Sequence, residues 1–457
     1  MAENIRKQIQ RGASPVAIIL GCVLSIPAQA DGLDMTFGLE QRLEADSNPG
    51  LDAGGSETEI SASTQLSFGL VRETPLDRFS FTASGLVRAE LSPDAELRFD
   101  DQKLGLGYAR EGANSGFEIE AGYHRANIAY LQPLSDFLND DGEIELPEDL
   151  EDLNGTGTRE NLSLSTQLEL GRDAPLGATF TARFLDRSYS GTTNPDLFDS
   201  QRTKLGTDIH LRLSPVAEGS LGLNYHLYDA DDTEGTRRET TTTQVGIHYD
   251  VSPILQFEAS LGYAIIDTEE FAITTRTEGM FGRLTAELER PNGTVTADLH
   301  SDITEDGTIH TFRIGRALDL PSGALAASIG VSKPEGGPSH LIGSLDWRHD
   351  LPTGKLNAQL LRSVGFDDDD GITTTTALAL GYSHEINNVS GLNFDLNYAV
   401  IDDPTESRER GKFTAVYQRA LTADWGLNAG YRYRTRDSDA ESHAIFLSIG
   451  REFSGRP

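Results

Sequence analysis

Apolar and polar residues alternate strictly along many short segments of the chain. From Leu33 to Glu44 one parity is mostly leucine, methionine and phenylalanine, and the other is mostly threonine, glutamate and arginine. The same pattern recurs from Leu255 to Ile265 and from Leu392 to Val400. Because residues two apart share one face of a β-strand, each segment predicts a strand with one apolar and one polar face. No long helical periodicity interrupts the series.

The connectors between these segments are of two kinds that take turns along the chain. One kind is short and rich in Pro, Gly or Asn, and it occupies residues 73–77, 173–177, 214–219, 251–253, 290–293, 320–323, 351–354 and 387–391. The other kind is longer or acidic, and it occupies residues 45–57, 132–157, 192–200, 230–235, 366–371 and 402–407. Short turns at one end and long polar loops at the other are typical of an outer-membrane β-barrel.

The pattern therefore predicts an all-β fold in which residues 31–457 form one transmembrane antiparallel β-barrel of about 22 strands (about 20–24), an even number as such barrels show. Both termini fall on the short-turn side. Because the first strand starts at Leu33, we expect no N-terminal plug domain, and the long loop 132–157 is expected to narrow the lumen. A soluble β-sandwich is the alternative. Both tryptophans, Trp347 and Trp425, lie beside short turns, which favours an interfacial aromatic girdle.

The first 30 residues have the three parts of a secretory signal peptide. A positively charged start is followed by an apolar run from Val16 to Pro27 and by the small-residue site Ala28-Gln29-Ala30. The run is about a dozen residues, too short for a transmembrane helix, which needs about 20. We therefore predict that residues 1–30 are cleaved after Ala30. The alternative is a buried N-terminal helix.

Cys22 is the one cysteine of the chain and lies inside this leader. Cleavage after Ala30 would leave a mature chain without any disulfide framework. The residues before Cys22 loosely resemble a lipoprotein box, so lipidation of Cys22 remains an alternative to cleavage after Ala30.

Composition and motifs argue against several function classes. The formal net charge of −34 argues against nucleic acid as a partner, since nucleic-acid binding needs a basic surface. The 10 histidines are scattered and form no H-E-x-x-H motif, and no G-x-S-x-G is present, so no enzyme is predicted. We likewise expect no cofactor.

Two acidic stretches partly match a calcium-binding loop. In residues 137–148, which include Asn139-Asp140-Asp141-Gly142, and in residues 366–371, a phenylalanine occupies the first ligand position, where the calcium loop needs a carboxylate. No metal site is therefore predicted, and both stretches are interpreted as solvated loops. The alternative is divalent-cation binding near the lipopolysaccharide surface.

A basic group of side chains is the candidate site. Tyr431 and Tyr433 fall on the apolar parity, which places the alternate residues of that strand on the lumen side. The preceding strand has the same arrangement, with Phe413 and Tyr417 on its apolar parity. The six predicted luminal cations are Arg408, Arg410, Lys412, Arg432, Arg434 and Arg436. Like charges side by side are costly in a soluble sheet, whereas in a water-filled lumen they can meet anions. The alternative is a solvated patch balanced by acidic loop residues.

The last predicted strand, His443–Phe453, resembles the C-terminal recognition strand of outer-membrane proteins in its alternation, in Gly450 and in the aromatic Phe453. Residues 454–457 follow the aromatic, and the usual second aromatic is missing. The resemblance implies that the barrel-assembly machinery is a partner through this strand. Outer-membrane lipid and lipopolysaccharide are the other expected partners.

Residues 31–457 as a whole resemble the porin-like β-barrel proteins of the Gram-negative outer membrane, some of which are encoded beside exopolysaccharide genes. The resemblance rests on pattern rather than on a diagnostic motif. It implies an outer-membrane location and a channel that passes polar solutes or an exported polysaccharide. The alternative function is a structural or surface-binding barrel without transport activity.

Overall fold

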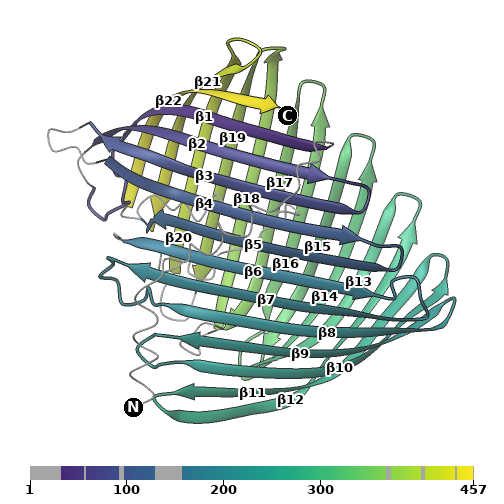
Figure 1. Ribbon diagram of the computed structural model, residues 1–457. Helices are drawn as coiled ribbons and strands as arrows, with labels where there is room; N and C mark the ends of the chain where they lie inside the picture. The colour runs from purple at the N-terminus through teal and green to yellow at the C-terminus, as the bar shows by residue number, and fades with distance from the viewer. Residues whose placement is uncertain are drawn as a thin grey trace.

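The computed structural model folds the chain into one antiparallel sheet of 22 strands that closes on itself (Figure 1). It describes residues 32–55, 58–91, 97–128, 157–366, 372–402, 407–437 and 440–455. The predicted signal peptide with Cys22 lies outside the described residues, as do almost all of the loop 132–157 and residues 367–371 of the second acidic stretch. The strand number and the all-β class predicted from alternation are confirmed.

The strands have the following bounds: β1 Leu33–Asp46, β2 Glu59–Glu73, β3 Asp77–Glu90, β4 Leu97–Glu111, β5 Ser115–Asn127, β6 Thr158–Leu170, β7 Leu176–Ser190, β8 Ser200–Ser214, β9 Ala217–Ala230, β10 Arg237–Ser252, β11 Leu255–Glu270, β12 Ile273–Arg290, β13 Gly293–Thr304, β14 Gly307–Leu320, β15 Gly323–Pro334, β16 His340–Leu351, β17 Gly354–Phe366, β18 Ile372–Asn387, β19 Ser390–Asp402, β20 Ser407–Ala420, β21 Trp425–Arg436 and β22 Ala440–Gly455.

Each strand pairs with the next one along the chain, and the last strand closes the barrel against the first. β22 pairs antiparallel with β1 over a register that sets Phe453 opposite Phe37 and Ala444 opposite Asp46. Closure leaves no free sheet edge, so the backbone hydrogen bonds of both terminal strands are satisfied within the barrel. It also brings together residues from the two ends of the chain.

Connectors are in general longer at one end of the barrel than at the other, although not at every hairpin. At the short-turn end, two-residue links such as Pro215-Val216 and Pro352-Thr353 join successive strands. The opposite end, called here the long-loop end, carries the longer connectors. Yet only Phe271 and Ala272 join β11 to β12 there, both with positive φ (49° and 61°), and the β13–β14 link is equally short. Positive φ at both central residues is the geometry of a tight hairpin turn.

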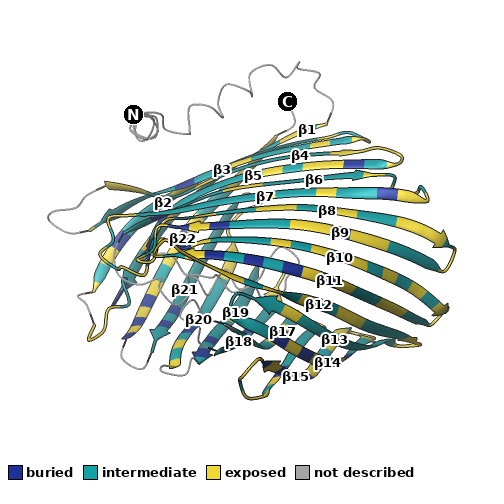
Figure 2. Cartoon of the chain, turned by 90° about the horizontal axis from the view of Figure 1, so that it is seen from below, coloured by how far each residue is buried: buried dark blue, intermediate teal, exposed yellow. Residues whose placement is uncertain are grey.

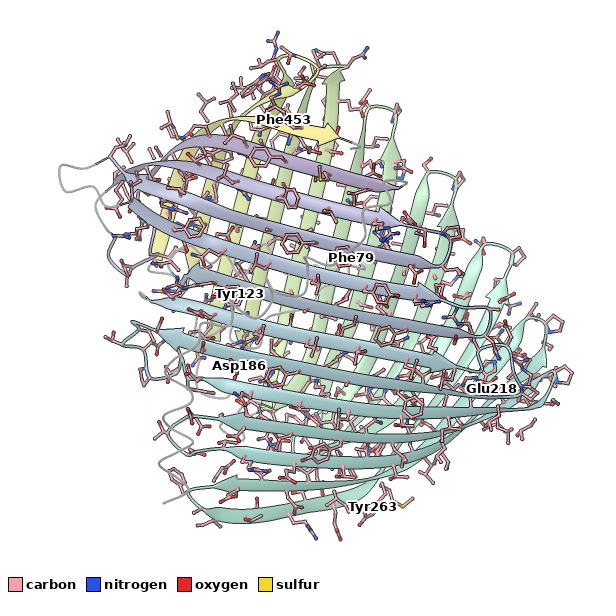
Figure 3. All side chains as sticks on the ribbon, viewed as in Figure 1. Phe79, Tyr123, Asp186, Glu218, Tyr263 and Phe453 are labelled. Carbon is pink, nitrogen blue, oxygen red and sulfur yellow. The ribbon has the colours of Figure 1, made fainter. Side chains whose placement is uncertain are left out.

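Side chains alternate between an outer and a luminal face, as the sequence pattern predicts. In β22 the odd positions Ile445 and Leu447 are 63% and 48% exposed, whereas Ala444 is 1% exposed. Exposed and buried positions alternate in the same way along other strands (Figure 2). Tyr263 and Phe453, labelled in Figure 3, belong to the outer set and are 43% and 41% exposed. The barrel therefore presents its large apolar side chains outward, the reverse of a water-soluble protein.

Several aromatic side chains lie near the short-turn end of the outer face. Tyr249 is 46% exposed close to the end of β10. Tyr108 packs against Phe117 at 6.3 Å between ring centroids, and Tyr382 stacks on Phe394 at 6.2 Å. The outer face thus carries aromatic side chains near this end of the barrel, where the sequence predicts an aromatic girdle. Among the described residues, none forms a helix long and apolar enough to cross a membrane.

Candidate luminal site at the barrel closure

The six predicted cations come from adjacent strands, and the pairing register brings most of them side by side. β20 pairs with β21 so that Arg410 lies opposite Arg436 and Lys412 lies opposite Arg434. Arg408 lies one step nearer the long-loop end and pairs with Ile401 of β19. Side chains directly opposite each other in an antiparallel pair have Cβ atoms about 4.5–5.5 Å apart. The register therefore places like charges in contact, and the fold must supply carboxylates nearby.

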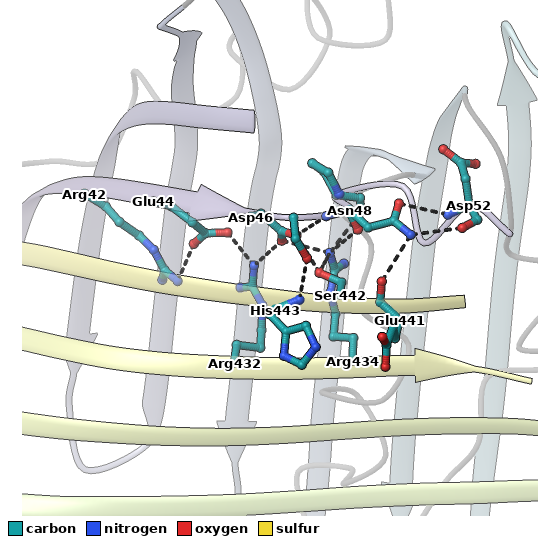
Figure 4. A network of polar contacts seen from close by, with 12 residues as sticks. Arg42, Glu44, Asp46, Asn48, Asp52, Arg432, Arg434, Glu441, Ser442 and His443 are labelled. Atoms are coloured by element: carbon teal, nitrogen blue, oxygen red, sulfur yellow. Dashed lines mark hydrogen bonds and ion pairs between the residues drawn. The ribbon is translucent and has the colours of Figure 1, made fainter. Parts of the chain in front are cut away.

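Asp46 of β1 supplies one of those carboxylates. Its Oδ2 accepts from Arg434 at 2.9 Å and from Arg432 at 3.2 Å, and Arg432 also bonds to Glu44 (Figure 4). Glu44 in turn is 2.6 Å from Arg42. Arg432 and Arg434 belong to β21, whereas Glu44 and Asp46 belong to β1, and β22 runs between these two strands. The ion pairs of Arg432 and Arg434 therefore reach across β22 and do not join directly hydrogen-bonded strands.

Small polar groups complete the network. Ser442 of β22 donates from Oγ to Asp46 at 2.5 Å, and its own oxygen accepts from Arg434 at 3.3 Å. Arg434 also donates to the carbonyls of Asn48 and Pro49 at 3.2 and 3.0 Å. The Asn48 amide donates to the carbonyls of Asp52 and Glu441. The start of the β1–β2 loop is thereby tied to β22.

Burial decides what this network does. The side chains of Arg434 and Asp46 are only 6% and 7% exposed, and those of Arg432 and Glu44 are 11% and 13% exposed. Ions this far from water are tolerated only when each is paired and hydrogen-bonded. Arg432 and Arg434 are thus charge-neutralised members of a closure network. Arg436 is different, because its ion pair with Asp437 is 4.0 Å long.

Below this network, towards the short-turn end, the luminal wall is hollowed by a cavity of about 380 Å³. Its lining comes from the four strands around the closure and includes Glu40, Arg42, Lys412, Thr414, Val416, Gln418, Asn428, Arg432, Phe446 and Ser448. Lys412 is the member of the predicted basic group that lines it together with Arg432. Arg408, Arg410 and Lys412 each interact with their surroundings as well.

Phe446 is the aromatic of this cavity, and sequence reasoning missed it. Its ring lies 3.8 Å from the guanidinium carbon of Arg42, a cation–π contact. On the other side it covers Gly430, which is opposite in the register; a Cβ at Gly430 would clash with the ring. The available signal was parity, since Phe446 alternates with the outward Ile445 and Leu447.

The site offers charge, amide and aromatic contacts rather than reactive groups. No cluster of three or more His, Cys, Asp or Glu side chains suited to a metal ion occurs in the described part of the chain. What the arrangement can do is bind: planar guanidinium groups, Lys412, the amides of Gln418 and Asn428 and an aromatic ring converge on one wall of the lumen. Such groups orient a polar solute.

No protein-family model and no curated protein matches the chain. Solved structures do match its fold. The ferric-catecholate import receptor Fiu from E. coli K12 aligns with a TM-score of 0.58 and 8% identity, over 91% of this chain and 81% of that chain. The FrpB iron transporter from Neisseria meningitidis aligns with a TM-score of 0.56 and 9% identity, over 92% and 81%.

The siderophore receptor PirA from Pseudomonas aeruginosa aligns with a TM-score of 0.50 and 11% identity, over 93% of this chain and 80% of that chain. At such identities the likeness shows the fold alone. The matched structures are β-barrels of iron and siderophore transporters. They support the β-barrel fold expected from the sequence and do not point to a porin family in particular.

Proposed function

We propose that the protein is an outer-membrane channel that passes polar solutes through the barrel lumen. One observation carries the proposal. The outer wall exposes apolar side chains such as Leu261 (52%) and Leu447 (48%), while charged side chains such as Arg42 and Lys412 line a cavity on the inner wall. An apolar exterior suits lipid, and a polar interior suits water and dissolved solutes. The shared fold with outer-membrane transporters supports the same conclusion.

Barrel size supports passage rather than a purely structural role. Barrels of about 16–18 strands already leave an aqueous channel, so 22 strands enclose a wider lumen. The cargo is either a small polar solute or an exported polysaccharide. Phe446, Gln418 and Asn428 in the cavity offer the aromatic and amide contacts that suit sugar rings as well as small polar molecules.

Planar-bilayer recording of the purified full chain tests the proposal. We expect ohmic, stepwise conductance in potassium chloride. Liposome-swelling rates with sugars of increasing size would then separate a channel for small solutes from one that admits oligosaccharides. A correctly folded barrel that neither conducts nor admits any sugar would overturn the channel and favour the structural or surface-binding alternative.

A further inference from the structure

A second basic group lines the lumen on the wall opposite the closure, on strands β7 to β10. In the register, Arg183 pairs with Lys204, and Lys204 pairs with His226. One step nearer the long-loop end, Arg202 pairs with Tyr228 and Tyr228 pairs with Arg238. These six side chains form two adjacent rows and are called here the opposite-wall patch. β10 lies half-way round the 22-stranded sheet from β21 (Figure 1).

Tyr228 organises the patch. It is 8% exposed, and the guanidinium carbons of Arg202 and Arg238 lie 4.7 Å and 6.0 Å from its ring centroid. One aromatic ring therefore fixes two guanidinium groups from the strands on either side of it. Since neighbouring strands are about 4.8 Å apart, the two arginine backbones are separated by about 10 Å. That spacing suits two oxyanion groups of one solute or a chain of linked ones.

Luminal cations and luminal carboxylates on these strands lie at different distances from the long-loop end. The luminal carboxylates on β7 to β10 are Asp208, Glu218 and Asp250, which all lie nearer the short-turn end than the patch. Glu305, from the β13–β14 link, pairs with Arg238 at 2.5 Å and holds it from the rim side. The patch thus groups four cationic side chains in the long-loop half of the wall, where Arg202, Lys204 and Tyr228 also interact with their surroundings. The low-dielectric wall of the barrel focuses the field of such a group.

His226 adds a hydrogen-bonding group at the centre of the patch. Its Nε2 is buried and has no hydrogen-bond partner among the described residues. A buried imidazole nitrogen without a partner costs free energy unless a bound group satisfies it. Lys204 lies opposite His226 in the register, with Arg183 beyond it. His226 therefore lies in the same row of the patch as Lys204 and Arg183.

We propose that the opposite-wall patch is an oxyanion-binding site, which takes a solute carrying phosphate, sulfate or carboxylate groups on its way through the lumen. Guanidinium groups bind such groups in two-pronged geometry, and Arg and Lys clusters favour anions in pores. The inference deepens the proposed channel function by assigning its solute class. Binding itself needs no conduction, so the two proposals fail separately.

Isothermal titration calorimetry on the detergent-purified full chain tests the site, with inorganic tripolyphosphate, sulfate and citrate as separate probes. We expect binding of at least one probe and a loss of about tenfold or more in affinity in the Arg202→Gln, Arg238→Gln variant. The matched control is Arg212→Gln, which changes the luminal face of the same strand β8 outside the patch and should leave affinity unchanged. The three probes show which oxyanion is preferred.

Tyr228 provides a second variant pair in case the double arginine variant does not fold. Tyr228→Phe keeps the ring and should bind like the wild type, whereas Tyr228→Leu should bind less tightly. No binding of any probe by the wild type would overturn the inference even if the channel conducts. Equal losses in the patch and in Arg212→Gln would overturn it too, because the effect would then be general charge. Binding in a non-conducting barrel would support the site and remove the channel.

Discussion

Arg434 on β21 donates to the carboxylate of Asp46 on β1 at 2.9 Å, although the two residues are 388 positions apart in the chain. β22 runs between their strands, and its Ser442 bonds to both side chains. The pair therefore depends on the register of all three strands, β1, β22 and β21. A shift of β22 against either neighbour by one residue would turn its side chains to the other face and break the network. The contact specifies how the barrel closes.

Arg434→Met should destabilise the barrel strongly, by about 3–5 kcal/mol, because it leaves Asp46 buried beside an incompletely paired network. Urea unfolding in lipid vesicles measures the loss. The double variant Arg434→Met, Asp46→Leu should recover part of it, since both charges are then absent. Arg436→Met is the control and should be mild, because the Arg436 pair with Asp437 is long at 4.0 Å. Equal costs at both arginines would contradict a closure role.

Gly430→Ala should destabilise the barrel by about 1–3 kcal/mol, as overpacking does. The new methyl group would clash with the ring of Phe446, and moving the ring also disturbs its contact with Arg42. Adding Phe446→Leu to this variant should restore part of the stability in the same unfolding measurement. An unchanged free energy of unfolding in Gly430→Ala alone would show that the ring is not held against the glycine.

Substitution by a larger polar residue should cost much more stability on the outer face of β11 than on its luminal face. Leu261→Arg puts a charge on the outer face, where Leu261 is 52% exposed, and should cost about 2–4 kcal/mol if the residue lies at the bilayer midplane. Ser260→Gln, one residue away on the luminal face, should be mild; glutamine is used because Arg283 lies opposite Ser260. Vesicle unfolding measures both, and similar costs would mean that the faces are wrongly assigned.

Ion preference should depend on Lys412 more than on the arginines of the closure network. Arg432 and Arg434 are bonded to Glu44 and Asp46, so replacing either of them would also disturb the closure network, whereas Lys412 lines the cavity below that network. Lys412→Glu should shift the reversal potential in a salt gradient toward cation preference. Arg419→Glu, on the outer face of the same strand by parity, is the control. If Lys412→Glu conducts and its reversal potential is unchanged, the basic group has no influence on ion preference.

The mature protein is predicted to begin at Asp31, because a charged start, a short apolar run and Ala28-Gln29-Ala30 precede it. Edman sequencing of protein purified from the envelope measures this directly. A blocked N-terminus with an acylated Cys22 would favour the lipoprotein alternative instead.

How much of this was available from the sequence depends on the range of the interaction concerned. Strand alternation has a period of two residues, so any short window reports both the strand and its faces. The strand number, the outward Leu261 and the luminal parity of Lys412 and Arg434 could therefore be predicted. The tight turn at Phe271-Ala272 was not foreseen, because neither residue type favours positive φ.

The pairing of charges was beyond the sequence. Alternation says that Arg434, Asp46 and Ser442 face the lumen, but it does not say how far β22 slides along β1. That register is set by closure of the whole barrel, and it alone decides that Asp46 meets Arg434 at 2.9 Å. The same holds for Arg202, Tyr228 and Arg238, whose parity is readable and whose alignment in one row is not. The sequence by itself determined which face each side chain occupies, and only the closed tertiary structure decided which side chains meet, because a hydrogen bond needs positions fixed to within a few tenths of an ångström.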